Sequence, residues 1–269
     1  MPIRRYHLAW YAGLVFAPLL LLQGLWLRRR IERLPDAQGD AVGRVGDPTT
    51  AVLRLNVVGE SPVAGVGVAN HTEGLACQAA QHLAGFIGGQ VEWSAEGLSG
   101  SNAQYWVKQF GALSREPVAN ADVIVVVLGV NDTTGLVPLG RWRRDIEHLI
   151  DQLRGQAALL VFSAVPPVGH FTALAAPLRW WLGWRALMLD HALKRVVCGV
   201  QPNSGIRVSH LDSQPSLRPE MLARDGFHPS ARGYRQWGER LAEHIVTEMR
   251  SPDRVSSPTK RDAGLLGSN

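Results

Sequence analysis

The chain has 269 residues, 46% of them hydrophobic and 19% charged, so it can bury one core of about 200 residues with extensions at its ends. The formal net charge is +5, but the basic excess lies at the two ends, where residues 1–35 carry six arginines and one glutamate. This distribution argues against nucleic acid as a partner. Cys77 and Cys198 are expected to be free thiols, and no His or Cys residues have metal-ligand spacing, so neither a metal nor a cofactor is expected.

An apolar segment lies near the start of the chain. Leu8 to Leu27 contains no charged residue, and at about 1.5 Å per residue a helix of this length can cross a hydrocarbon layer of about 30 Å. No small-residue cleavage pattern follows it, which favours an uncleaved membrane anchor over residues 1–33 with basic flanks. Pro18 and Gln23 weaken the run, so a buried or interfacial helix packed on the domain is the alternative. The arginine excess after the segment favours a cytoplasmic domain.

Strand and helix patterns alternate over residues 52–250, after a linker rich in glycine and proline at residues 34–51. Val123–Leu128 is apolar at every position, as expected for a parallel strand covered on both faces. The alternation predicts an α/β domain of three layers, α/β/α, with about five parallel strands. A disordered tail is expected at residues 251–269, which are rich in Ser, Pro and charge. The predicted strands are 52–58, 91–94, 123–128, 159–163 and 206–210, and the predicted helices are 71–87, 101–111, 141–154, 184–198 and 231–249.

Polar residues follow several of these strands. Ser61 comes after the first strand, Asn131 after the third, and Asp225 and His228 stand together before the last helix. In an open parallel sheet the carboxyl ends of the strands meet at one edge, where ligands bind. Each of these residues alone is common in turns, but their shared position at this edge of the sheet predicts one site.

The residue types at this edge indicate nucleophilic catalysis. A serine hydroxyl needs a base to remove its proton, which His228 can do, and Asp225 can orient the histidine ring. Attack on a carbonyl places negative charge on its oxygen, which needs preorganised donors. We therefore expect Ser61, Asp225 and His228 to be catalytic. The expected oxyanion donors are the backbone of Ser61, the amide of Asn131 and the backbone of Gly100, with Gly97 as the alternative to Gly100.

A second segment at the same edge is apolar and broken by proline and glycine. It runs from Pro166-Pro167 to Pro177–Trp184 after the fourth strand. Such a loop suits the wall of an acyl pocket or a surface that rests on a membrane. Ordinary packing of an irregular loop is the alternative. The tentative substrate-binding residues are Asp132, Pro167, Trp180 and Trp181.

These motifs resemble the blocks of the SGNH, or GDSL-type, serine hydrolase family over about residues 52–247. Glu60 stands where the family has Asp before the serine, which keeps the carboxylate but lengthens it. The resemblance implies a flavodoxin-like α/β/α fold and esterase, lipase, thioesterase or related acyl-hydrolase activity without a metal. The matching motifs are Gly59-Glu60-Ser61, Gly97-Leu98-Ser99-Gly100-Ser101, Gly129-Val130-Asn131-Asp132 and Asp225-Gly226-Phe227-His228-Pro229.

The same residues are compatible with other functions. An acyltransferase would use the same residues, and the acyl group could come from a small molecule, a lipid or a glycan. A non-catalytic binding protein on the same fold is the rival class, with Glu60 as its residue-level hint. The Gly-x-Ser-x-Gly elbow of α/β-hydrolases is a poor match, because Pro62 follows Ser61. The oligomeric state is not indicated.

Overall fold

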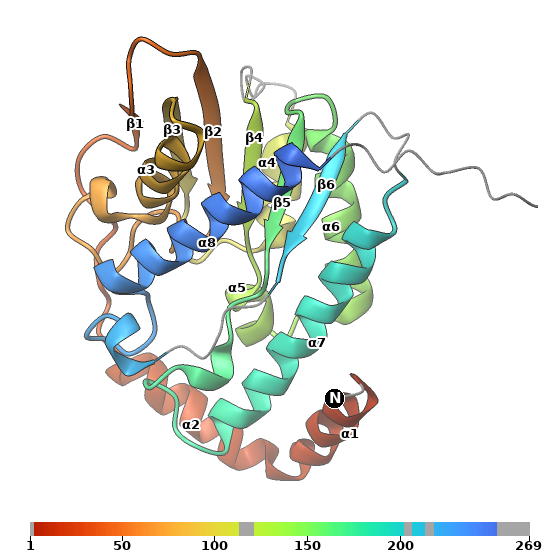
Figure 1. Cartoon of the computed structure of the whole chain (residues 1–269). Helices are drawn as coiled ribbons and strands as arrows, with labels where there is room; N and C mark the ends of the chain where they lie inside the picture. Colours follow the sequence, from red (N-terminus) through yellow and green to blue (C-terminus); the bar gives the residue numbers. More distant parts are fainter. Residues whose placement is uncertain (1–2, 113–120, 202–205, 213–217, 252–269) are drawn as a thin grey trace, which may run out of the picture.

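The computed structural model describes residues 3–112, 121–201, 206–212 and 218–251, so the expected tail at residues 252–269 lies outside the described part. The chain forms a single twisted sheet with helices on both faces, which is the predicted three-layer α/β/α arrangement (Figure 1). Two apolar clusters, one on each side of the sheet, form the core.

The sheet has six strands in the order β1-β3-β2-β4-β5-β6. Strands β2 to β6 run parallel to one another, which confirms the prediction of about five parallel strands. Strand β1 adds an antiparallel edge beside β3 and lies within the segment expected to be a linker. The strand bounds are β1 Val42–Val45, β2 Val52–Gly59, β3 Gln90–Gly97, β4 Val123–Val127, β5 Leu159–Ser163 and β6 Arg207–Leu211.

Helices α3 and α8 cover one face of the sheet, and α4, α6 and α7 cover the other. The short helix α5 follows β4 directly. The helix bounds are α3 Leu75–Ile87, α4 Ala103–Gly111, α5 Val130–Thr134, α6 Leu139–Leu153, α7 Leu178–Cys198 and α8 Ala231–Arg250. The 3₁₀ turns are η2 His71–Glu73, η3 Val168–His170 and η4 Pro219–Met221.

Helix α7 begins earlier than the sequence pattern predicted. Its first turns, from Leu178, occupy part of the segment that we expected to be an irregular loop. Gly183 looked like a helix breaker, but it packs against Gly169, and a Cβ at Gly183 would lie 2.8 Å from the Gly169 Cα. The glycine therefore allows α7 to approach the η3 turn closely instead of ending the helix.

The amino-terminal segment is helical but not continuous. It consists of α1 Ile3–Gly13, the 3₁₀ turn η1 Leu14–Phe16 and α2 Ala17–Arg30. Taken together, Arg4–Arg30 is a stretch of 27 residues that is long and apolar enough to cross a membrane or to act as a signal sequence. Both helices lie at the lower end of the molecule in Figure 1, beside the start of α7.

Candidate active site

The site is built where β2 ends beside β4. Gly59, the last residue of β2, has a φ of 152°, and a Cβ there would lie 2.0 Å from the carbonyl oxygen of Val127. Only glycine fits this close contact between the two strands. The backbone N–H of Glu60 donates to the same Val127 oxygen at 3.1 Å, so the turn that carries Ser61 is fixed against β4.

Ser61, His228 and Asp225 form a chain of hydrogen bonds. The Ser61 Oγ lies 3.0 Å from the His228 Nε2, and the His228 Nδ1 lies 2.6 Å from the Asp225 Oδ2. The Asp225 Oδ1 accepts the backbone N–H groups of Phe227 at 2.9 Å and of His228 at 3.0 Å. A proton on Nδ1 therefore faces the carboxylate and leaves Nε2 free to accept the serine proton.

Asp225 is held in its charged form by this arrangement. Burial alone would raise the pKa of its carboxyl group, but hydrogen bonds from the His228 ring and from two backbone N–H groups lower it below the ordinary value. The Asp225 side chain is fully buried, whereas the His228 side chain is 18% exposed. The carboxylate is thus shielded from water while the ring reaches the cavity.

Glu60 connects the serine turn to the loop that carries Asn131. Its carboxylate accepts the backbone N–H of Gly129, and its Oε2 accepts both the backbone N–H of Asn131 at 3.1 Å and the side-chain amide of Asn131 at 2.9 Å. Burial and the neighbouring Asp132 carboxylate raise the pKa of Glu60 to about 8. The residue that departs from the family pattern therefore orients Asn131.

The Asn131 amide meets two acceptors. Besides Glu60, its Nδ2 donates to the carbonyl oxygen of Ser101 at 2.8 Å. Both amide hydrogens are therefore engaged in this structure, and donation to a substrate oxyanion requires that one of these bonds be exchanged. The Ser101 carbonyl belongs to the turn after β3, so three of the four predicted segments meet at this side chain.

The two glycines weighed as oxyanion donors lie in different surroundings. A Cβ at Gly97 would lie 2.0 Å from the Ala64 backbone nitrogen, so Gly97 packs against the segment that follows Ser61. Gly100 has a φ of 83°, and a Cβ there would meet nothing within 4 Å. Gly97 is thus enclosed by backbone, whereas Gly100 faces open space, and Gly100 stays the expected oxyanion donor with Gly97 as the alternative.

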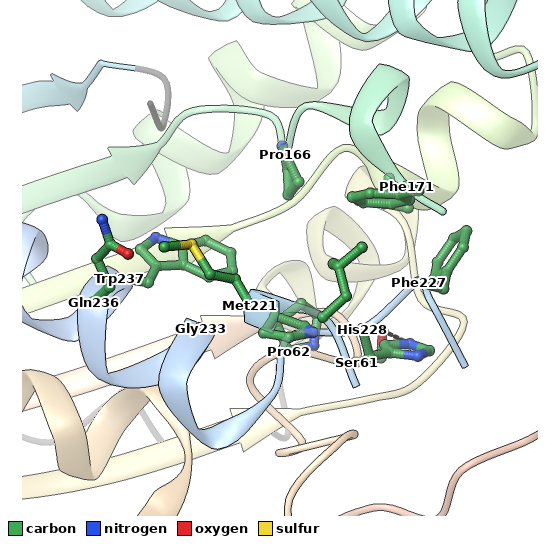
Figure 2. A pocket seen from close by; sticks show the side chains of 13 residues that line it. Ser61, Pro62, Pro166, Phe171, Met221, Phe227, His228, Gly233, Gln236 and Trp237 are labelled. Atoms are coloured by element: carbon green, nitrogen blue, oxygen red, sulfur yellow. Dashed lines mark hydrogen bonds between the residues drawn. The ribbon is translucent and has the colours of Figure 1, made fainter. Parts of the chain in front are cut away.

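An apolar cavity opens beside Ser61 and His228. It comprises about 560 Å³ of non-atom space, part of which is open to solvent. Figure 2 shows Met221 between the Ser61–His228 pair and the far end of the cavity, where Gln236 and Trp237 lie. The apolar lining residues are Pro62, Val130, Pro166, Phe171, Met221, Leu222, Phe227, Pro229 and Trp237. Among the described residues, no three His, Cys, Asp or Glu side chains gather as metal ligands would.

The tentative substrate residues of the Pro- and Trp-rich segment do not line this cavity. Pro166 does, whereas Pro167 does not. Trp180 is 53% exposed on α7, and Trp181 is buried against the ring of Trp10. The first turns of α7 are helical and turn Trp181 toward α1, so this residue takes part in packing, which was the alternative interpretation.

Sequence reasoning missed the cavity residues Phe171, Met221, Leu222 and Trp237. A signal was present for Trp237, because it follows Gly233 by four residues on the helix after His228 and both residues line the cavity. Met221 and Leu222 lie in and after a short 3₁₀ turn, for which no periodic pattern exists.

Asp132 does not reach the cavity either. Its side chain is completely buried, and its Oδ2 accepts the N–H of Ala103, the first residue of α4, at 3.2 Å. Burial raises the pKa of Asp132 to about 7. A charged side chain at this place caps a neighbouring helix instead of contacting a ligand.

Asp132→Asn is expected to flatten the dependence of stability on pH. Because the folded state raises the pKa of Asp132 from 3.8 to about 7, its contribution to stability is complete below pH 3.8 and is lost as the pH rises through 7. Between pH 5 and pH 8, the free energy of unfolding of the wild type should fall by about 2–3 kcal/mol more than that of the variant. Urea unfolding at the two pH values measures this difference. Asp151→Asn, on the exposed face of α6, is the control, and an equal fall in all three proteins would contradict the assignment.

Comparison with known proteins is consistent with this geometry. Residues 57–236 match the model of the GDSL-like Lipase/Acylhydrolase family, and a search of the curated proteins found no match. Solved structures also share the fold, and three of them serve as examples. A lipase, Lip_vut3 from a goat rumen metagenome, is 16% identical over 73% of this chain and 97% of its own, with a TM-score of 0.56. A lipase/acylhydrolase from Enterococcus faecalis is 17% identical (75% and 98% covered, TM-score 0.57) and a family 3 carbohydrate esterase from Clostridium thermocellum is 15% identical (74% and 98%, TM-score 0.56).

Proposed function

The chain belongs to the GDSL-like lipase/acylhydrolase family and is an ester-hydrolysing enzyme, and on this premise we propose that it cleaves carboxylic ester or thioester bonds through an acyl-enzyme on Ser61. The observation that carries the proposal is the hydrogen-bond chain from Ser61 through His228 to Asp225. These three hydrogen-bonded residues lie at the mouth of an apolar cavity that can receive an acyl group.

The mechanism follows from the orientation of each group. The Ser61 Oγ attacks the acyl carbonyl while the His228 Nε2 takes its proton, and Asp225 stabilises the imidazolium that forms. The oxyanion is held by the Ser61 N–H, a glycine N–H of the turn after β3 and the Asn131 amide. His228 returns the proton to the leaving oxygen or sulfur. Water then attacks the acyl-enzyme with His228 as base, which releases the acid and restores Ser61.

The substrate class is proposed from the cavity. Its lining is apolar from Pro62 to Trp237, which suits the hydrocarbon part of an acyl chain better than a polyhydroxylated group. The related folds include proteins named as lipases and as a carbohydrate esterase, so both lipid and glycan esters stay within the proposed range. Transfer to an acceptor other than water would need no different catalytic residue.

Membrane association is a further part of the proposal. The apolar residues 8–27 are proposed to hold the enzyme at a membrane, because Arg4–Arg30 is long and apolar enough to do so. The arginines that follow this segment favour a domain on the cytoplasmic side. No feature of the folded part favours nucleic acid as a partner.

Covalent labelling separates this enzyme from a binding protein on the same fold. A fluorophosphonate probe reacts only with an activated serine, so the wild-type chain should be labelled within minutes and Ser61→Ala should not be labelled. Ser99→Ala is the matched control, because Ser99 lies on a neighbouring turn and its hydroxyl donates to Asp36. Labelling that survives in Ser61→Ala, or no labelling of the wild type, would contradict the proposed nucleophile.

A further inference from the structure

The amino-terminal helices expose an unusually large apolar surface. In α2, Leu20 is buried and Gln23 and Leu27 are partly buried, at the three- and four-residue spacing of one helix face. The other faces of α1, η1 and α2 are apolar and open. We define the exposed apolar face as Leu8, Tyr11, Leu14, Val15, Phe16, Leu19, Leu21, Leu22, Leu25 and Trp26, which are 43–81% exposed. This many exposed large apolar side chains on three consecutive elements of a folded chain mark an interaction site.

Taken singly, neither helix is long enough to cross a bilayer, although Arg4–Arg30 as one straight helix would be. With 11 residues in α1 and 14 in α2, the helices span about 16 and 21 Å at 1.5 Å per residue, against about 30 Å of hydrocarbon. The break lies at η1, between Gly13 and Pro18, and Pro18 is at the first turn of α2 where it suits a new helix start. Figure 1 shows the two helices diverging at this break around the foot of α7.

Helix α2 is fastened to the domain through Gln23. Its Nε2 donates to the carbonyl oxygen of Ala176 at 2.8 Å, and its Oε1 accepts the N–H of Leu178 at 3.1 Å. Leu178 is the first residue of α7, so its backbone N–H has no partner within the helix and Gln23 supplies one. In a membrane-spanning helix the amide of Gln23 would lie in hydrocarbon without these partners, which is unfavourable for an unpaired polar group. Gln23, which weakened the prediction of a membrane-spanning helix, therefore docks α2 onto the domain.

Helix α1 is fastened through Trp10. Its ring stacks on Trp181 with centroids 5.1 Å apart, and its carbonyl oxygen accepts the Trp181 Nε1–H at 3.0 Å. The buried guanidinium of Arg185 lies 5.2 Å from the Trp10 ring centroid. Gly13 completes the contact, because a Cβ there would lie 2.5 Å from Trp181. Both helices are thus bound to α7 by specific contacts.

The docked helices lie at the end of the molecule that holds the active site. In Figure 1, α1 and α2 lie beyond the end of the sheet where β4 leads into α5. The chain after α2 continues along the rim, where Glu32 pairs with Arg224 at 2.8 Å, next to Asp225. Asp36 then accepts the Ser99 hydroxyl at 2.6 Å. Whatever covers the exposed apolar face is therefore close to the loops of the site.

Charge indicates which partner covers this face. Exposed arginines flank it on both sides, Arg4 and Arg5 before it and Arg28, Arg29 and Arg30 in the last turn of α2. An apolar strip between basic ends matches the acyl region and the anionic headgroups of a lipid surface. A second protein copy would bring the same arginines near one another, which is unfavourable.

We propose that α1, η1 and α2 bind as one docked unit in the plane of an anionic lipid surface, with the exposed apolar face in the acyl region, and that the Ser61 cavity takes its ester from that surface. The chain then rests on one leaflet without crossing the membrane. The choice of ester rests on the proposed function, whereas the mode of binding does not. The substrate class that follows is an ester carried by the membrane, such as an acylated lipid.

Cysteine labelling distinguishes this arrangement from a span. Single cysteines are placed by Arg4→Cys or Arg33→Cys in the full chain carrying Cys77→Ala and Cys198→Ser, and the protein is bound to preformed phosphatidylcholine/phosphatidylglycerol vesicles. A membrane-impermeant maleimide should label both positions to the same extent before and after detergent is added. Labelling at position 4 only after detergent would show that the segment crosses, and would overturn the proposal.

Substitution of the exposed apolar face gives a second test. Leu22→Asp should weaken sedimentation of the full chain with anionic vesicles about tenfold and slow hydrolysis of a vesicle-borne long-chain ester similarly, because a charge must enter the acyl region. Hydrolysis of soluble p-nitrophenyl butyrate should stay within twofold of the wild type. Thr247→Asp, on the exposed side of α8, is the matched control. Unchanged vesicle binding of Leu22→Asp, or a dimer that binds no vesicles, would overturn the proposal.

The two measurements distinguish failure of the acyl-hydrolase mechanism from failure of the membrane-binding mode. A chain that binds vesicles as predicted but hydrolyses no soluble ester would refute the acyl-hydrolase mechanism and leave the membrane mode standing. A chain that hydrolyses soluble esters but ignores anionic vesicles would refute only the membrane mode.

Discussion

Ser61→Ala is expected to abolish hydrolysis of p-nitrophenyl acetate, butyrate and octanoate, lowering kcat by a factor of about 10⁴–10⁶. The Ser61 Oγ is the atom within hydrogen-bond reach of the His228 Nε2, and alanine leaves no atom that can form the acyl-enzyme. The measurement is initial rate against ester concentration for the full chain in a mild detergent. Because the alanine variant keeps the cavity walls, binding of an unreactive ester analogue should remain within a fewfold of the wild type.

Ser99→Ala is the matched control for this experiment. Ser99 also lies in a turn after a parallel strand, but its hydroxyl donates to Asp36 and not to a histidine, so turnover should be unchanged within twofold. Equal rates in the wild type and Ser61→Ala would remove Ser61 as the nucleophile and leave the binding-protein interpretation as the better one. The ratio of octanoate to acetate rates in the wild type also reports whether the cavity from Pro62 to Trp237 receives the acyl chain.

The core of this fold could be predicted from the sequence because its strands carry a strong local signal. Val123–Val127 is buried at every position and lies at the centre of the sheet, as its unbroken apolar pattern predicts. Strand β1 carries no such signal, because its four residues are alternately exposed and half-buried at an edge. Edge pairing of that kind depends on the partner strand β3 and not on local composition.

The candidate site likewise contains residues that the sequence predicts and residues that only tertiary packing positions. Ser61, Asn131, Asp225 and His228 follow strands or precede a helix, so topology alone brings them to one edge, and the structure places Ser61, His228 and Asp225 in direct contact. The cavity walls could not be predicted, because Met221 and Phe171 come from irregular turns that only tertiary packing positions. The close backbone contact of Gly97 with Ala64 likewise depends on tertiary packing that no pattern encodes.

The Pro- and Trp-rich segment shows that an apolar composition does not determine which neighbours the side chains pack against. Its apolar character indicated an acyl-pocket wall, a surface that rests on a membrane or ordinary packing, and the helical start of α7 directs Trp181 toward Trp10 and away from the cavity. The same stacking holds α1 against the domain. The apolar residues of this segment therefore bear on how the enzyme meets a membrane more than on how it binds an acyl group in the cavity.

Asp225→Asn is expected to lower kcat about 10³–10⁴-fold with little change in KM. In the wild type, the Asp225 Oδ1 accepts two backbone N–H groups while Oδ2 accepts the His228 Nδ1–H. An asparagine can keep the backbone bonds only by placing its carbonyl oxygen at the Oδ1 position, so its amide group then faces Nδ1 and donates to it. His228 must carry its proton on Nε2 instead, and can no longer accept the Ser61 proton.

The chain provides a matched control for this substitution in a second Asp–His pair. The Asp190 Oδ1 lies 3.1 Å from the His210 Nε2 and accepts the N–H of Val165 at 3.0 Å, but neither residue lines the cavity. Asp190→Asn therefore makes the same chemical change outside the site and should leave kcat within a fewfold of the wild type. A fall of less than tenfold in Asp225→Asn, or an equal fall in both variants, would mean that the carboxylate at position 225 stabilises the loop without setting the histidine tautomer. A large fall confined to Asp225→Asn would tie the rate to the proton position on His228, because asparagine can keep both backbone bonds of Asp225 and changes only the group that faces Nδ1.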